Sequence, residues 1–503
     1  MRSIFSILFC YLAFFGTIQS ASSGPPSPLK TAINEFRNDP ALINANWSIH
    51  IADITSGEEI FSHNIHKPLL QASVQKILTT SAAMMMLGSD FQYETVLQYD
   101  GNIDRSGVLQ GNLYIKGSGD PTLGAVQFDD TLNIDLVFGK WVDVLKDLGV
   151  KEISGSIIAD ERVFDNTMIP PRWLWGHIGN YFGAGASGLS VHENEYTVYF
   201  NAGAGIGSPA HISKTEPYVP AMHFINEVTT GPANSGDQVY IFGAPFAAER
   251  WLTGTIPLGA RDFAVRGSLP DPPAYLAESF RLFLQQQDIS VGGHSATYRT
   301  LDTTRMRVSD ERTTVHTLHS PYLFDIIYRT NINSSNSYAE NLLKTLASHS
   351  GRERASFDDG IEVLLDHWAG MGMNNDQLML YDGSGLSPSN RITTAQMMTA
   401  LSSSAGHPAF PVLLHSLPLA GYSGSLVNQF RGTVSEGLLR AKSGYLLNVR
   451  SYAGYTTMRN GHLAAFVIVA NDYNCSPAAM RLKMMHLMNA ITLHSGQQLD
   501  ADR

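Results

Sequence analysis

A serine and a lysine three residues apart are the first residues in the chain whose types and spacing could do chemistry. Ser73 and Lys76 open an apolar stretch that ends at Gly88, which is typical of a buried helix with glycine as its stop signal. Residues three apart on a helix share one face. A serine hydroxyl needs an adjacent base, and lysine serves as one when burial or a nearby cation lowers its pKa. A helix N-cap at Ser73 with a solvated Lys76 is the alternative, and residues 27–30 repeat the pattern in a proline-rich linker.

A second polar triplet, Ser334-Ser335-Asn336, precedes a helical pattern that begins at Tyr338. Such a triplet can direct a hydroxyl and an amide into one cleft. An ordinary polar turn before a helix is the alternative, and residues 62–64 have the same Ser-x-Asn pattern. Taken alone, the triplet decides nothing.

The third candidate is Lys442-Ser443-Gly444, just before the alternating run 447–455. In a strand, Lys442 and Gly444 would face one side, and Ser443 and Tyr445 the other. A glycine in a strand lets another backbone lie close, which would admit an extended substrate. A solvated lysine on an edge strand is the alternative. No other Lys-Ser/Thr-Gly triplet occurs in the chain.

The order of the three motifs is more informative than any one of them. Ser-x-x-Lys, Ser-x-Asn and Lys-Ser/Thr-Gly in this order resemble the penicillin-recognising serine enzymes. The stretch between Lys76 and Ser334 is too long for a single-domain β-lactamase. It is similar to the class C low-molecular-mass penicillin-binding proteins, a D-alanyl-D-alanine carboxypeptidase/endopeptidase family with two further domains inserted at this point. Four other stretches resemble that family, at residues 117–123, 381–387, 417–426 and 440–444.

The resemblance implies a role for each catalytic candidate. Ser73 would attack the carbonyl between two D-alanines while Lys76 takes its proton. Ser334 would pass a proton to the departing amine, and Asn336 would hold the peptide backbone. Lys442 would keep Lys76 neutral by like-charge repulsion and attract the terminal carboxylate.

Three further residues are predicted to bind the substrate: Ser443, Gly444 and Tyr445. Ser443 would donate a hydrogen bond to the carboxylate. The backbone N–H groups of Ser73 and Tyr445 would form the oxyanion hole. Tyr445 stands where the family usually has a small hydroxyl residue, so the contact of that hydroxyl with the carboxylate should be altered.

The resemblance also implies the fold. We expect an α/β (α+β) transpeptidase/β-lactamase-like domain, an antiparallel sheet flanked by helices, built from residues 27–94 and 305–503. Short strand-like runs between Gly, Asn and Asp turns predict β-rich material in the inserted stretch, and the resemblance implies that it forms two domains. Residues 95–205 and 275–304 would form domain II, and residues 206–274 domain III.

Secondary-structure signals agree with this arrangement. The sequence predicts helices near 322–330, 338–347, 357–370 and 394–402, and a last helix after Pro477. Asn460-Gly461 between two apolar runs predicts a β-hairpin.

Composition excludes several classes of protein. The formal net charge of -11, without a long basic run, argues against a nucleic-acid partner. The 17 histidines show no HExxH or paired zinc spacing, so we expect no metal and no cofactor.

Residues 1–22 have the layout of a secretory signal peptide, with a membrane anchor as the alternative. We therefore expect export across the inner membrane to the periplasm or cell wall, with at most peripheral membrane association. Cys475 would be a free thiol.

The sequence thus predicts a serine-type D-Ala-D-Ala carboxypeptidase and/or endopeptidase, with peptidoglycan peptides and β-lactams as its partners. A β-lactamase-like hydrolase and a non-catalytic peptidoglycan-binding protein of the same fold are the alternatives. The balance between carboxypeptidase and endopeptidase activity, the third residue of the stem peptide and the oligomeric state are left open.

Overall fold

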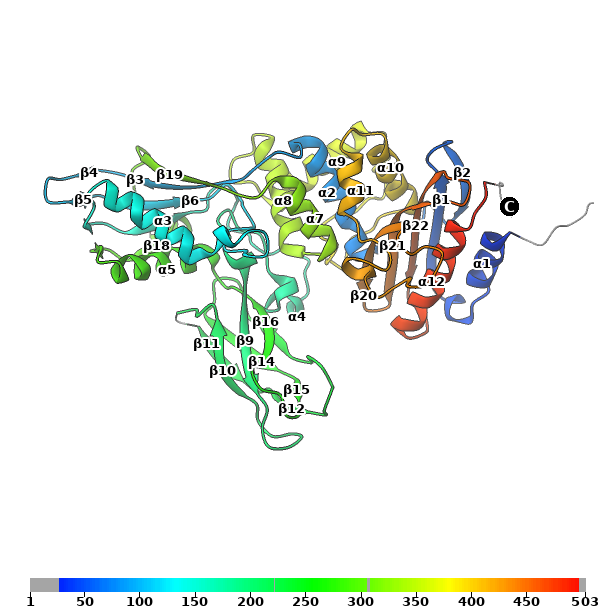
Figure 1. The fold of residues 1–503 in the computed structure, drawn as a ribbon, viewed down its shortest axis with the longest axis horizontal. Helices are drawn as coiled ribbons and strands as arrows, with labels where there is room; N and C mark the ends of the chain where they lie inside the picture. The colour runs from blue at the N-terminus through cyan, green and yellow to red at the C-terminus, as the bar shows by residue number, and fades with distance from the viewer. Residues whose placement is uncertain (1–26, 221, 305–307, 497–503) are drawn as a thin grey trace, which may run out of the picture.

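The computed structural model describes residues 27–220, 222–304 and 308–496 of the 503-residue chain. Two lobes lie along the long axis of the molecule, and a third projects from between them (Figure 1). The predicted signal peptide, residues 1–22, lies outside the described residues. Among the residues that are described, no helix is both long and apolar enough to cross a membrane.

The lobe that carries the three motifs is built on a five-stranded antiparallel sheet. Its strands lie in the order β2 (Glu58–His63), β1 (Asn46–Asp53), β22 (Leu463–Asn471), β21 (Val449–Thr457) and β20 (Leu439–Leu446). The two ends of the chain meet at the β1–β22 pair, where Ile49 lies opposite Ile468. β20 is an edge strand, so one of its sides is open to other partners.

Helices cover both faces of this sheet (Figure 1). One face packs on α1 (Pro28–Arg37) and α12 (Pro477–Thr492). The other packs on α2 (Lys76–Leu87), α7 (Leu323–Ile332), α8 (Asn336–His349), α9 (Phe357–Gly370), α10 (Thr394–Ala405) and α11 (Phe410–Ser416). β22 is buried on both sides because Phe466 and Ile468 contact the first layer, while Val467 and Val469 contact the second.

The secondary-structure predictions for this lobe are confirmed. Helix α9 has the predicted bounds, and α7, α8, α10 and α12 lie where they were expected. The Asn460-Gly461 turn joins β21 to β22. This agreement fits the predicted antiparallel sheet with helices on both faces.

The second lobe contains two sheets. The larger has the order β18 (Ser295–Thr297), β8 (Ile157–Asp160), β6 (Leu113–Lys116), β3 (Glu94–Tyr99) and β19 (Thr313–His319). The smaller has the order β17 (Ser290–Val291), β7 (Glu152–Ile153), β5 (Val108–Gln110) and β4 (Asn102–Ile103).

Three helices accompany these sheets: α3 (Ile134–Asp147), α5 (Pro272–Gln286) and α6 (Tyr298–Thr304). Helices α3 and α5 were not predicted, because they lie in a region whose pattern indicated β-rich structure. Both are amphipathic, and Phe138 and Trp141 of α3 pack against Phe280 of α5. They are needed because a sheet must bury its apolar face against another layer.

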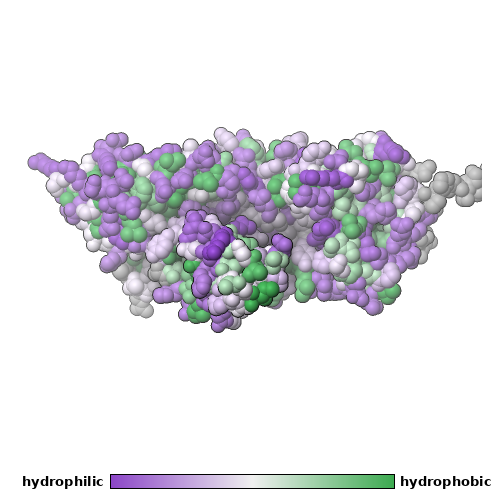
Figure 2. Space-filling model, turned by 60° about the horizontal axis from the view of Figure 1, so that its bottom comes forward, coloured by the Kyte–Doolittle hydropathy of each residue, from purple (hydrophilic) through white to green (hydrophobic). Residues whose placement is uncertain are grey.

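The third lobe is made of short strands. One sheet has the strand order β10 (His211–Glu216), β9 (Glu195–Asn201), β16 (Phe263–Ser268). A second has the order β11 (His223–Asn226), β14 (Glu249–Thr253), β13 (Tyr240–Phe242). A third pairs β12 (Thr229–Gly231) with β15 (Thr255–Pro257). The short helix α4 (Trp175–Ile178) lies between this lobe and the one that carries the three motifs (Figure 1). The third lobe projects toward the viewer in Figure 2, with a small group of hydrophobic residues among polar ones.

The predicted domain limits stay a prediction. Strand β19 pairs with β3 although it follows residue 305, and β9 pairs with β10 and β16 although it precedes residue 206. We propose that the second limit of domain II lies after β19, and that domain III begins near β9.

Candidate active site

Ser73 lies in the single 3-10 turn η2 (Ala72–Gln75), which leads directly into α2. The residue before it, Ala72, has a left-handed φ of 49°, which is uncommon outside glycine. Such strain persists only where the surrounding structure imposes it. Here the Gln71 side chain donates to the Ile392 carbonyl at 3.1 Å, and Ser451 Oγ donates to the Gln71 carbonyl at 2.5 Å. The turn is thus held at both sides, with Ser73 half-buried at its centre.

The Lys76 amine is fully buried and makes three hydrogen bonds. Its Nζ lies 3.0 Å from Ser73 Oγ, 2.6 Å from Asn336 Oδ1 and 2.8 Å from the Ser384 carbonyl oxygen. The amide and carbonyl oxygens can only accept hydrogen bonds. A neutral amine would therefore keep its two protons on these acceptors, and its lone pair would face the Ser73 hydroxyl.

The electrostatics of Lys76 favour this neutral form. Burial lowers the pKa of the amine to about 7, while Glu340 and Asp382 act in the opposite direction. Burial, followed by the charge of Lys76, holds the pKa of Lys442 well below its ordinary value. Burial is thus enough to explain the low pKa of Lys76. The like-charge repulsion from Lys442, which the sequence suggested, stays a prediction.

Two residues that the sequence analysis did not assign hold the turn beside Lys76. The Glu340 carboxylate accepts the backbone N–H groups of Gly383 and Ser384 at 2.8 and 2.9 Å. Asp382 accepts the indole N–H of Trp173 at 2.8 Å. For the first, the sequence shows only that it follows Asn336 by one helical turn, which does not reveal its burial or its partners. The second belongs to a stretch that was noted only for its family resemblance.

The Ser-x-Asn motif lies at the start of α8. Ser334 has a left-handed φ of 55°, and Ser335 caps the helix through a hydrogen bond from the Tyr338 N–H. The amide of Asn336 is oriented from both ends. Its Nδ2 donates to the Phe182 carbonyl at 2.7 Å, so that Oδ1 faces Lys76.

Lys442 connects the third motif to the second. Its buried Nζ donates to Ser334 Oγ at 2.8 Å and to the Ser443 carbonyl at 3.0 Å. Ser443 Oγ donates in turn to Ser425 Oγ at 2.7 Å. The structure therefore brings Ser73, Lys76 and Asn336 into one hydrogen-bonded group, and Ser334 and Lys442 into another.

Packing within the protein leaves no room for a side chain at Gly444. A Cβ atom there would lie 2.3 Å from Ser451 Oγ and 2.4 Å from the Gln71 carbonyl oxygen. The missing side chain lets β20 approach the turn that carries Ser73. This packing is one reason for a glycine here, and the role of Gly444 beside a substrate backbone, which the sequence suggested, stays a prediction.

The outer edge of β20 is open where the substrate is expected. The Ala441 N–H donates to the Pro418 carbonyl at 3.0 Å, so the backbone groups of Ala441 point outward. In an antiparallel strand this orientation repeats at every second residue, which includes Ser443 and Tyr445. Beyond Ala441, the described residues leave this edge without a backbone partner. The Tyr445 N–H thus faces this open edge, and the residue is 50% exposed.

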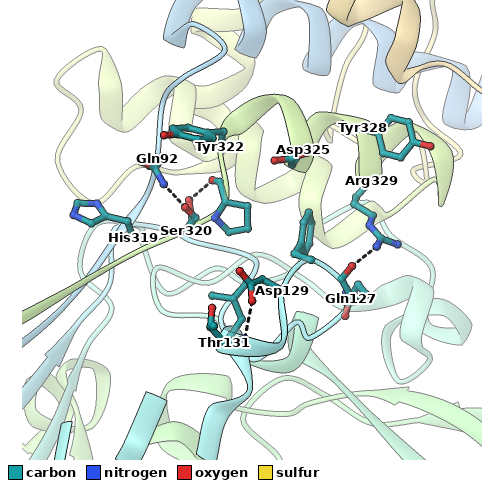
Figure 3. Close-up of a pocket in the computed structure, with 13 residues that line it drawn as sticks. Gln92, Gln127, Asp129, Thr131, His319, Ser320, Tyr322, Asp325, Tyr328 and Arg329 are labelled. Carbon is teal, nitrogen blue, oxygen red and sulfur yellow. Dashed lines mark hydrogen bonds between the residues drawn. The ribbon is translucent and has the colours of Figure 1, made fainter. Parts of the chain in front are cut away.

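Two hollows lie near these elements. One of about 320 Å³ is bordered by Ser334 and Asn336 together with Tyr181 and Phe182. Another of about 460 Å³ lies where α7 meets the second lobe, and it contains none of the predicted site residues (Figure 3). Arg329 donates to the Gln127 carbonyl across this second hollow. The second hollow marks the joint between lobes, and the first adjoins the motif residues.

Within the described residues, no group of three His, Cys, Asp or Glu side chains is placed to hold a metal ion. Cys475 is a free, partly buried thiol.

Comparison with known proteins agrees with this geometry. The sequence profile of the D-Ala-D-Ala carboxypeptidase 3 (S13) family matches residues 29–491. The chain belongs to this family. It is therefore a serine-type carboxypeptidase, and the enzyme class that the three motifs predicted is confirmed.

Two relatives match most of the chain. The D-alanyl-D-alanine carboxypeptidase of Actinomadura sp. (strain R39) is 28% identical over 491 residues, which span 93% of this chain and 85% of the relative. D-alanyl-D-alanine carboxypeptidase DacB of Haemophilus influenzae is 25% identical and spans 87% of each chain.

A solved structure shows the same fold. The crystal structure of penicillin binding protein 4 (dacB) from Haemophilus influenzae aligns with a TM-score of 0.77 at 23% identity, covering 91% of this chain and 97% of that one. The predicted fold class is thus confirmed.

Proposed function

We propose that this chain cleaves the D-Ala-D-Ala bond of peptidoglycan stem peptides through an acyl-enzyme on Ser73. The observation that carries the proposal is the position of the Lys76 amine, 3.0 Å from Ser73 Oγ. Its two other hydrogen bonds are donated to Asn336 Oδ1 and to the Ser384 carbonyl. Family membership supports the same reaction class.

Acylation would begin when the neutral Lys76 takes the Ser73 proton. Ser73 Oγ attacks the carbonyl carbon, and the N–H groups of Ser73 and Tyr445 stabilise the oxyanion that forms. The C–N bond then breaks, and the departing amine takes a proton from the Ser334 hydroxyl. Lys442, 2.8 Å from Ser334 Oγ, replaces that proton.

Deacylation would use the same base. The Lys76 amine has a pKa of about 7, so it returns its proton to solvent near neutral pH. It can then activate a water molecule, which attacks the ester carbonyl and releases the shortened peptide.

The C-terminal carboxylate of the substrate would lie beside Lys442 and Ser443. An arriving carboxylate favours the charged form of Lys442, because an opposite charge raises the pKa of an amine. Ser443 Oγ can exchange its hydrogen bond to Ser425 for one to the carboxylate. An extended peptide would pair with the open edge of β20.

A β-lactam would acylate the same serine. One solved structure of the Haemophilus influenzae protein is a complex with a β-lactam. We also propose export of this chain by residues 1–22, which would place the enzyme in the periplasm or at the cell wall.

Labelling with penicillin tests the proposal. The protein should form a stable adduct, and mass spectrometry of a digest should place it on the peptide that contains Ser73. Ser73→Ala should abolish the adduct. Ser62→Ala should keep it, because Ser62 belongs to the other Ser-x-Asn sequence, in β2, where its hydroxyl donates to Glu59. An adduct elsewhere, or none on the wild-type protein, contradicts the proposal, and rapid release of hydrolysed penicillin would indicate a β-lactamase.

A further inference from the structure

Glu340 is a buried carboxylate that contacts neither Ser73 nor the expected position of the substrate. It lies on α8 one turn after Asn336 and is fully buried. Its two carboxylate oxygens accept the N–H groups of Gly383 and Ser384 separately, at 2.8 and 2.9 Å. Among the described residues it makes no ion pair, although Lys76 and Lys344 interact with it electrostatically. Burying a carboxyl group without an ion pair is costly, so its place here calls for an explanation.

The two bonds fix the peptide segment beside the catalytic lysine. Ser384, whose N–H donates to Glu340, accepts Lys76 Nζ through its carbonyl oxygen at 2.8 Å. The other fixed acceptor of Lys76 is Asn336 Oδ1, which lies on the same helix. Helix α8 therefore sets both acceptors, one through the Asn336 side chain and the other through Glu340.

We propose that Glu340 is a positioning residue for acylation, which holds the Ser384 carbonyl so that the lone pair of the Lys76 amine faces Ser73. The inference rests on the proposed function of Ser73 and Lys76. Glutamate fits this task because each of its oxygens can accept one of the two N–H groups. A glutamine of the same shape has only one acceptor oxygen, and its amide would oppose the second N–H.

Titration separates a positioning role from a charge effect. Glu340 from α8, Asp382 from the following turn and Lys442 from β20 are the titratable groups that face Lys76, and Lys344 on α8 faces Glu340. Burial lowers the pKa of Lys76 to about 7. Burial, followed by the charge of Asp382, raises the pKa of Glu340 to about 8, so the Glu340 carboxyl is mostly protonated where Lys76 titrates. Replacing Glu340 by the neutral glutamine should therefore leave the pKa of Lys76 in place and act on the rate alone.

The test measures penicillin acylation of Glu340→Gln across pH. The plateau rate should fall by roughly tenfold or more, because the Ser384 carbonyl loses its fixed orientation. The acid limb should stay near pH 7, because the Glu340 carboxyl is mostly protonated there in the wild-type protein. A limb that moves together with the plateau would show that Glu340 acts through the pKa of Lys76, and would overturn the positioning role.

A matched control is available in the second lobe. Glu161 is also buried, and its carboxylate accepts the N–H groups of Tyr298 and Arg299 at 3.2 and 2.8 Å. Glu161→Gln removes the same kind of bond pair away from Ser73, and should leave both the rate and the profile unchanged. Glu340→Asp keeps both oxygens and the charge on a shorter side chain. It should keep the wild-type acid limb while its plateau falls several-fold.

The outcomes separate the alternatives. Glu340→Gln acylated within about twofold of wild type, with an unchanged profile, overturns the inference. Equal slowing of Glu161→Gln overturns it too, because the effect would then be a general one. If Glu340→Gln does not fold, the test rests on Glu340→Asp. A plateau rate of acylation in Glu340→Asp equal to that of the wild type then overturns the inference. A wild-type protein that is not labelled at Ser73 would instead reject the proposed function.

Discussion

Replacing Gly444 by alanine should separate β20 from the turn that carries Ser73. The added Cβ would lie 2.3 Å from Ser451 Oγ, 2.4 Å from the Gln71 carbonyl oxygen and 3.2 Å from Ala72 Cβ. The first two atoms cannot move apart freely, because Ser451 Oγ donates to the Gln71 carbonyl at 2.5 Å. The contact with the Gln71 oxygen must lengthen by about 1 Å to reach the ordinary range, which begins at 3.4 Å.

Such a shift has two measurable effects. Overpacking of this kind lowers the free energy of unfolding by about 1–3 kcal/mol, which urea denaturation measures. A displacement of about 1 Å between catalytic groups lowers the rate by about a hundredfold, or about 2.7 kcal/mol of activation free energy. The assay is the rate of penicillin acylation under conditions where the variant is folded.

Gly139 in α3 supplies the control for this substitution. A Cβ atom there meets nothing within 4 Å, so Gly139→Ala should acylate at the wild-type rate. It should raise the free energy of unfolding by about 0.5–1 kcal/mol, because it replaces glycine inside a helix. If Gly444→Ala acylates within about twofold of wild type, the close approach of β20 is not needed for catalysis and the reasoning fails.

Three other predictions follow from the site. The rate of penicillin acylation should rise about tenfold per pH unit below pH 7 and level off above it. The reason is that only the neutral Lys76 amine accepts the Ser73 proton, and the pKa of this amine is about 7. A rate that is constant between pH 5 and 8 would refute this. Tyr445→Thr should raise kcat/KM on a D-Ala-D-Ala peptide and the acylation rate by about tenfold, because a charge-assisted hydrogen bond is worth roughly 1.5–3 kcal/mol; changes below about twofold in both would show the ring to be neutral. Peptidase activity should survive EDTA, because Ser73–Lys76 chemistry uses no metal ion, and a loss that zinc restores would reveal a site that we have missed.

The sequence predicted those parts of the site that depend on local spacing. Ser73 and Lys76 share a helical turn, so their contact follows from a separation of three residues. The order of motifs carried the rest of the resemblance. Contacts between segments far apart in the chain were not predictable in this way, and Glu340 is the clearest example. Nothing local in α8 indicates that this carboxylate meets the Gly383 N–H, because that contact depends on the packed fold.

Gly444 shows a different limit. The sequence correctly indicated that a backbone must pass close to this position, since glycine in a strand permits such an approach. It could not indicate whether that backbone belongs to a substrate or to the protein. In the structure the neighbouring backbone is that of Gln71, whose carbonyl oxygen would lie 2.4 Å from a Cβ atom at position 444.

Residues of the inserted region help to orient the groups around Lys76. The Asn336 side chain can present either its oxygen, an acceptor, or its NH₂ group, a competing donor, to the Lys76 amine. The Phe182 carbonyl, which belongs to the inserted segment, accepts Nδ2 at 2.7 Å and thereby turns Oδ1 toward Lys76. Trp173 of the same segment donates to Asp382, which is buried beside the Ser384 turn. Because both acceptors of Lys76 are thus set partly by the insertion, the catalytic lobe alone would lack the geometry that keeps its base directed at Ser73.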